Sequence, residues 1–204
     1  MGVMPFYLAT EDPISQALAI QVVEQTGAGP FVFEALKTSG FGHLKKNLPA
    51  LLRLAAHCPV FLLTDLDQKP CAPFLMQQWL GENPLPERFL FRVAVREVES
   101  WLLADRKGMA DFMGAPLEQI PANPDFLADP KETVLKIARR YASRAVRRDI
   151  VPAKGVRAKV GVGYNQRLMA FVKESWCLER AVLHSESLGR AHHRLRVILQ
   201  NLEG

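Results

Sequence analysis

The chain has 204 residues, of which 49% are hydrophobic, and a formal net charge of +5 at pH 7. These values predict a soluble globular protein with one good-sized core. The sequence contains no run of about 18 apolar residues that would span a membrane, and its start lacks the basic and apolar regions of a secretory signal. The three cysteines, Cys58, Cys71 and Cys177, follow neither a disulfide nor a zinc pattern, so we expect a reducing, cytoplasmic location.

The charges are unevenly distributed along the chain. Residues 1–130 contain 10 Lys and Arg against 15 Asp and Glu, whereas residues 131–159 contain 10 against 2. This asymmetry predicts an acidic site beside a surface that attracts phosphates. An ordinary solvated helix face explains the basic segment equally well.

Apolar and β-branched runs alternate with helical patterns in the first half of the chain. Strands are expected over residues 5–10, 31–36, 59–64 and 89–95, and helices are expected to follow each of the first three. The helix after the first strand is expected to be capped by Asp12 or Thr10, with Pro13 near its first position. Short connections between alternating strands and helices predict an α/β fold with a largely parallel sheet flanked by helices.

The pattern changes after about residue 106. Residues 131–148 read as one basic helix, residues 155–163 as a loop rich in Gly and basic side chains, and two further helices follow. We therefore divide the chain into an α/β domain, residues 1–110, and a basic helical extension packed on it, residues 111–204.

Acidic residues follow three of the predicted strands. Asp65 and Asp67 lie at the carboxyl end of the third strand, and because side chains alternate along a strand, both are expected to point to the same side. Glu11 follows the first strand, and Glu97 and Glu99 follow the fourth. Ligands gather at the carboxyl ends of parallel strands, so these acids predict a site for Mg²⁺ or Mn²⁺. Taken singly, each acid is better explained as a surface charge or a cap.

The basic segment provides candidate contacts to nucleic-acid phosphates. The five arginines among them are best viewed as a patch, whereas each of the three loop residues taken alone is better explained as a generic surface charge. The candidates are Arg139, Arg140, Arg144, Arg147, Arg148, Lys154, Arg157 and Lys159.

Two stretches resemble the motifs of the Toprim fold, in which a Glu follows the first strand and Asp-x-Asp follows a later one. Residues 6–11 and 60–67 are similar to these motifs. The resemblance extends to small Toprim-like proteins encoded beside ATPases in bacterial phage-defence islands, and distantly to overcoming-lysogenization-defect nucleases. Those small proteins carry a Glu before an apolar Trp-containing segment, similar to Glu99-Ser100-Trp101, and a Ser-rich turn before a last helix, similar to Ser185-Glu186-Ser187.

The resemblance implies a Toprim-like, Rossmann-like fold. It also implies that Glu11, Asp65, Asp67 and Glu99 are catalytic residues that bind Mg²⁺ or Mn²⁺. The implied partners are nucleic acid and an ATPase encoded nearby. The resemblance is compatible with an oligomer and implies no contact with a membrane. One position departs from the pattern, since many Toprim proteins have Gly directly after the first Glu and this chain has Asp12.

The sequence therefore favours a metal-dependent nuclease or phosphodiesterase that acts on DNA or RNA, within phage defence. The alternative is a non-catalytic Toprim-like subunit that binds a partner ATPase or nucleic acid. A receiver-like phosphoacceptor domain is a weaker alternative, because the sequence shows no Lys at a later strand exit.

Overall fold

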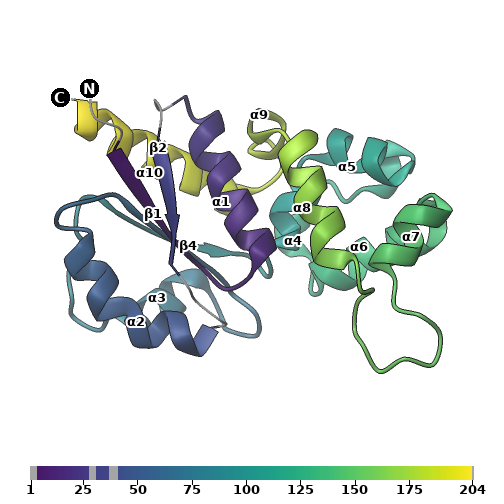
Figure 1. Cartoon of the computed structure of the whole chain (residues 1–204), viewed down its shortest axis with the longest axis horizontal. Coiled ribbons are helices and arrows are strands. Elements are labelled where there is room, and N and C mark those ends of the chain that lie inside the picture. Colours follow the sequence, from purple (N-terminus) through teal and green to yellow (C-terminus); the bar gives the residue numbers. More distant parts are fainter. Residues whose placement is uncertain (1–3, 28–30, 37–40, 204) are drawn as a thin grey trace.

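The computed structural model describes residues 4–27, 31–36 and 41–203 of the chain. Within these residues, four parallel strands form one sheet in the order β2-β1-β3-β4, with helices on both faces (Figure 1). The strands are β1 (Met4–Thr10), β2 (Phe31–Ala35), β3 (Val60–Asp65) and β4 (Phe89–Ala94). The predicted α/β class, with a parallel sheet and a C-terminal helical region, is confirmed.

The carboxyl ends of β1, β3 and β4 meet at one edge of the sheet because all the strand pairs are parallel. Thr10 of β1 pairs in register with Leu63 of β3, and Asp65 of β3 pairs with Ala94 of β4. The segments that leave the three strands are therefore neighbours, although they are far apart in the sequence.

Alternate residues of the strands divide between two hydrophobic clusters, one on each face of the sheet. Leu62 and Phe91 belong to one cluster, and Phe61 and Leu90 belong to the other. The first face is covered by α2 (Phe41–Leu54) and α3 (Ala72–Leu80), and the second by α1 (Pro13–Gln25) and α10 (Glu186–Glu203) (Figure 1). β3 and β4 are buried and largely apolar on both faces, as in other parallel sheets, whereas β2 is partly exposed along its length.

The segment between β4 and α10 is helical and shares the core of the second face. Trp101 and Trp176 are buried there, and Trp176 Nε1 donates a hydrogen bond of 3.0 Å to the Trp101 carbonyl oxygen. Among the helices described, none is long and apolar enough to cross a membrane. The elements of this segment are α4 (Glu99–Ala104), α5 (Arg106–Met113), η1 (Leu117–Gln119), η2 (Pro124–Phe126), α6 (Pro130–Tyr141), α7 (Arg144–Ile150), α8 (Tyr164–Glu174) and α9 (Leu178–Ala181).

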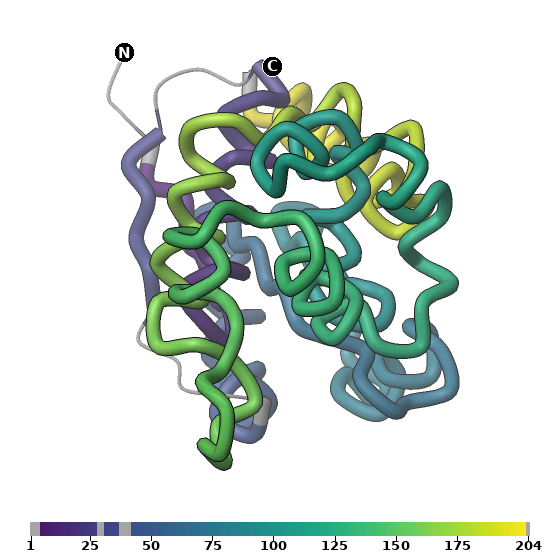
Figure 2. The backbone as a smooth tube through the Cα atoms, turned by 90° about the vertical axis from the view of Figure 1, so that its right-hand side faces the viewer, coloured from purple at the N-terminus to yellow at the C-terminus, as the bar shows by residue number. Residues whose placement is uncertain are grey.

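The basic segment forms two helices, so the prediction of one helix over residues 131–148 is wrong. Helix α6 ends at Tyr141, Ala142 has an extended backbone, and the Ser143 side chain accepts a hydrogen bond of 3.3 Å from the Val146 N–H to begin α7. Lys and Arg are good helix formers, so their high frequency here favoured one continuous helix over a break capped by Ser143. The chain between α7 and α8 projects from the helical region as a long loop (Figures 1 and 2).

Candidate metal centre

The predicted carboxylates lie together at the carboxyl edge of the sheet. Glu11 follows β1, Asp65 ends β3, Asp67 lies in the turn after β3, and Glu99 begins α4 after β4. The carboxylates of Glu99, Glu11 and Asp67 all act electrostatically on Asp65. Asp12 acts on Asp65 as well. We refer to Glu11, Asp65, Asp67 and Glu99 as the carboxylate cluster.

Glu11 connects the ends of β1 and β3. Its Oε1 accepts a hydrogen bond of 3.1 Å from the Asp65 N–H and a short one from the Thr64 hydroxyl. Burial raises the pKa of Glu11, and the two hydrogen bonds oppose this increase because they stabilise the ionised form. Thr64, which the sequence analysis did not single out, thus fixes the position of the Glu11 carboxylate.

Asp65 lies at the centre of the cluster. Its Oδ1 accepts a hydrogen bond of 2.8 Å from the Val98 N–H, which ties the end of β3 to the segment after β4. Burial is the main cause that raises the pKa of Asp65 well above its usual range, and repulsion from Glu99 and Glu11 adds to it. This carboxylate therefore has a strong tendency to bind a proton or a cation.

Glu99 is the most deeply buried member of the cluster, with 1% of the residue exposed. Its Oε1 accepts a hydrogen bond of 2.9 Å from the Tyr164 hydroxyl and lies 3.5 Å from Lys131 Nζ. Burial raises the pKa of Glu99 even though Lys131 and Tyr164 act in the opposite direction. Its Oε2 is buried and has no hydrogen-bond partner within the part of the chain that the structure describes. A buried carboxylate oxygen without a partner is costly, and this atom points to a further ligand or proton.

Lys131 contacts the cluster, and the sequence analysis did not single it out. Its Nζ lies 3.4 Å from Glu97 Oε1 and 3.5 Å from Glu99 Oε1, and its backbone N–H donates a hydrogen bond of 3.0 Å to Glu97 Oε2. Burial alone would lower the pKa of this ammonium group, but the carboxylates of Glu99 and Glu97 outweigh burial and raise it. Its only signal in the sequence is its place as the first residue of the basic segment.

Asp67 and Asp12 lie at the margin of the cluster. Asp67 is exposed and adopts a left-handed backbone with φ 50°, which aspartate tolerates in turns. Asp12 is the N-cap of α1, as expected, and its Oδ1 accepts hydrogen bonds of 2.8 and 2.9 Å from the N–H groups of Ile14 and Ser15. The residue that departs from the Toprim pattern thus has a structural role in capping the helix.

The donor chemistry of the cluster fits a hard divalent cation, because such ions prefer carboxylate oxygens. The unpartnered, buried Oε2 of Glu99 favours the same interpretation. However, no three His, Cys, Asp or Glu side chains among the described residues are placed so that they could hold a metal ion. Ligation by three of these carboxylates therefore requires their side chains to move from the positions seen.

Comparison with known proteins does not identify a family for this chain. No family model matches the sequence, and no significant match is found among curated proteins or solved structures. The classification that the structure supports is therefore an α/β fold with a four-stranded parallel sheet.

The predicted nucleic-acid-binding residues lie apart from the carboxylates. Helix α6 carries Lys131 at the cluster and Arg139 eight residues later, and a rise of about 1.5 Å per residue separates the two by about 12 Å along the helix. Helix α7, with three of the other arginines, lies at the end of the helical region far from the sheet (Figure 1). The predicted residues on these helices are Arg139, Arg140, Arg144, Arg147 and Arg148.

Several of these basic side chains already have partners. Arg139 forms an ion pair of 2.7 Å with Glu132, and the guanidinium of Arg140 lies over the Tyr141 ring, 5.2 Å from its centroid. The loop residues Lys154, Arg157 and Lys159 are exposed. The glycines near the end of this loop have a packing role, since a Cβ atom on Gly161 would lie 2.2 Å from the Asp149 carbonyl oxygen.

Proposed function

We propose that the protein is a divalent-metal-dependent nuclease or phosphodiesterase that acts on DNA or RNA. The observation that carries this proposal is the buried Glu99, whose Oε2 lacks a hydrogen-bond partner among the described residues, beside the carboxylates of Asp65 and Glu11. Several acids gathered in a partly buried site repel one another, and a bound cation relieves that repulsion. One lysine, Lys131, offsets only part of the negative charge of this cluster.

In this proposal Glu11, Asp65, Asp67 and Glu99 hold Mg²⁺ or Mn²⁺. The ion would activate water and stabilise the charge that develops on a phosphoryl group. The Val98 N–H orients Asp65, and the Tyr164 hydroxyl and Lys131 orient Glu99. The raised pKa of Glu11 suits a group that takes up and releases a proton during the reaction.

The Toprim assignment is part of the proposal, and three features support it. The two Toprim-like motifs end neighbouring strands, β1 and β3, and the Glu99 segment follows the next strand, β4. Trp101 Nε1 donates a hydrogen bond of 2.8 Å to Ser187 Oγ, which joins the Trp-containing segment to the Ser-rich turn. Asp12 departs from the motif, but its cap role leaves the carboxylate cluster intact. A role in phage defence beside a partner ATPase follows from this resemblance alone.

The test is cleavage of labelled single-stranded and double-stranded DNA and RNA with Mg²⁺, Mn²⁺ or EDTA. We expect metal-dependent cleavage that falls by at least about a hundredfold in Asp65→Asn and Glu11→Gln proteins. Asp111→Asn and Glu118→Gln are the matched controls, because both residues are exposed and lie outside the cluster. Absence of metal-dependent cleavage of every substrate, both alone and with an ATPase encoded nearby, would contradict the proposal.

A second candidate function is that of a non-catalytic subunit that binds a partner ATPase or nucleic acid. It is favoured by the ion pair between Lys131 and Glu99, which already neutralises one acid, and by the lack of three metal-ready ligands among the described residues. For this function, binding of the partner or nucleic acid should persist in the Asp65→Asn protein, and no cleavage should accompany it.

A further inference from the structure

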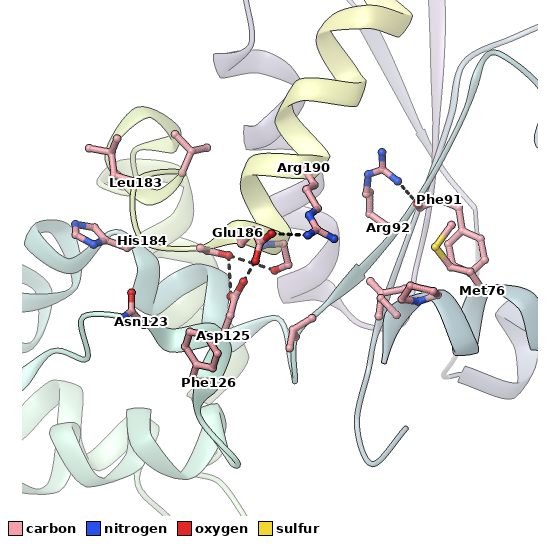
Figure 3. A pocket seen from close by; sticks show the side chains of 17 residues that line it. Met76, Phe91, Arg92, Asn123, Asp125, Phe126, Leu183, His184, Glu186 and Arg190 are labelled. Carbon is pink, nitrogen blue, oxygen red and sulfur yellow. Dashed lines mark hydrogen bonds and ion pairs between the residues drawn. The ribbon is translucent and has the colours of Figure 1, made fainter. Parts of the chain in front are cut away.

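A cavity of about 530 Å³ lies along β4, the strand at one edge of the sheet. Its walls come from α3, β4, η2, residues 182–187 and the first turns of α10 (Figure 3). None of the four clustered carboxylates is among its described lining residues. Its volume lies within the range of small-molecule sites, about 300–1,000 Å³.

Arg92 is the unusual residue of this cavity. Strand alternation places it on the face of the sheet that α10 covers, on the same side as the buried Leu90 and Ala94. Its Nη1 donates a hydrogen bond of 2.9 Å to the Phe91 carbonyl oxygen, whereas its Nε is buried and has no partner in the described residues. A buried guanidinium donor without an acceptor is costly, so the site is incomplete as it stands.

Two more arginines from α10 approach Arg92. Arg190 lines the same cavity. Arg92, Arg190 and Arg194 all line a shallower depression of about 640 Å³ beside the cavity. Figure 3 shows Arg92 on β4, joined to the Phe91 carbonyl oxygen, and Arg190 on α10, joined to Glu186. Burial, followed by repulsion from Arg194 and Arg190, lowers the pKa of Arg92 to about 10. The three guanidinium groups thus form a local positive centre.

The neighbouring acids neutralise only part of this centre. Glu186 is paired with Arg190 on the same helix. Asp125 accepts hydrogen bonds of 2.8 Å from the Ser185 hydroxyl and the Ser187 N–H, which use both of its carboxylate oxygens. The charged groups that act on Arg92 are both arginines. Arg92 thus keeps a buried donor without an acceptor, and an anion would supply that acceptor.

Part of the remaining cavity wall is apolar. Met76 and Phe91 line its inner part, and Phe126 and Leu183 line it while remaining 87% and 78% exposed. Large apolar side chains with this much exposure beside a cavity are typical of ligand-binding surfaces. The cavity thus combines a cationic side with apolar surface that can pack against a ring.

We propose that this cavity binds a nucleoside phosphate, with the phosphate held by Arg92, Arg190 and Arg194 and the base against the apolar wall. Guanidinium groups bind phosphate oxygens through paired, charge-assisted hydrogen bonds, and the Arg92 Nε–H would gain its missing acceptor. The nucleoside phosphate can be a free nucleotide or the terminal nucleotide of a strand. The proposal does not depend on whether the carboxylate cluster is catalytic.

The test is isothermal titration calorimetry of the full chain in EDTA, with AMP, adenosine, inorganic phosphate and a 5′-phosphorylated dinucleotide as probes. We expect AMP to bind at least about tenfold more tightly than adenosine or inorganic phosphate, because only AMP uses both sides of the cavity. A dinucleotide that binds more tightly than AMP identifies a strand end as the ligand, and one that binds equally or more weakly identifies a free nucleotide.

The variants Arg92→Gln and Arg194→Gln should each weaken AMP binding by about tenfold or more. Arg196→Gln is the matched control, since Arg196 lies two residues further along α10, is exposed and lines neither the cavity nor the depression that Arg194 lines. Circular dichroism establishes that each variant is folded, and Arg194→Gln carries the test if Arg92→Gln unfolds. The proposal is overturned if folded wild-type protein binds neither AMP nor phosphate. Equal loss of binding in Arg196→Gln and Arg194→Gln, or unchanged binding in folded Arg194→Gln, overturns it as well.

Discussion

The ion pairs of Lys131 provide the sharpest test of how the carboxylate cluster is stabilised. We predict that Lys131→Met lowers the free energy of unfolding by about 2 kcal/mol. Methionine preserves most of the volume of the side chain and removes its charge. The backbone N–H of residue 131 still donates to Glu97, so the substitution isolates the ammonium group.

The magnitude follows from the two short distances. At 3.4 and 3.5 Å from carboxylate oxygens, and with an effective dielectric constant of about 20, each attraction is worth about 5 kcal/mol before desolvation. Two costs reduce this figure. Burial removes hydration from the ammonium group, and the Lys131 side chain keeps 35% exposure, so solvent screens part of the attraction.

The assay is urea unfolding of a double-mutant cycle that combines Lys131→Met with Glu99→Gln. Because Gln carries no charge, the loss of Lys131 should matter less in the Glu99→Gln background, and we expect a coupling energy of about 1 kcal/mol or more. Lys107→Met is the matched control. Lys107 pairs with Asp111 at 3.0 Å, but both side chains are 68% exposed, so that substitution should change stability by less than about 0.5 kcal/mol. Equal effects of the two lysine substitutions, or a coupling energy near zero, would refute this reasoning.

Three further predictions concern the cluster and the buried turn before α5. Burial and repulsion raise the pKa of Asp65 in the folded state, so its contribution to stability is lost as pH rises through that raised pKa. Asp65→Asn should therefore stabilise the metal-free protein at pH 7. In urea unfolding, this advantage should shrink as the pH is lowered toward 4. An advantage that grows as the pH falls would contradict this assignment. Asp105 is fully buried and accepts hydrogen bonds of 2.6 and 2.7 Å from Arg180. Asp105→Asn should therefore lower the free energy of unfolding by about 2–3 kcal/mol in the same assay. A decrease below about 1 kcal/mol would show that Arg180 finds other acceptors. Gly108→Ala should lower the thermal midpoint, because the added Cβ would lie 2.3 Å from Asp105 Oδ2. Gly42→Ala, whose added Cβ would have none of the surveyed atoms within 4 Å, should raise the midpoint because helices prefer Ala to Gly. Equal shifts would disprove the clash.

The sheet could be predicted from the sequence because local patterns determine its strands. Each predicted strand is an apolar run bounded by turn residues, and each lies within a few residues of the observed strand. The acids after three of these strands converge for the same reason, since parallel strands bring their carboxyl ends to one edge. The convergence of Glu11, Asp65 and Glu99 could therefore be predicted without knowledge of the tertiary structure.

The partners of these acids could not be predicted in this way. Lys131 and Tyr164 reach Glu99 from helices 32 and 65 residues later in the chain, and no local pattern specifies how those helices pack. Arg92 reads as an ordinary polar residue on a strand, and its burial depends on α10, almost 100 residues away. Such contacts between distant elements are set by packing of the whole core.

The position of α10 has a consequence for how the protein is made. The last helix covers the face of the sheet that Phe61 and Leu90 present, and it is synthesised after every other element described. While the ribosome is still translating the preceding segment, this apolar surface lacks its final cover and is open to chaperones and to aggregation. The sheet therefore completes its folding only after α10 has been synthesised, even though its strands are finished by residue 94.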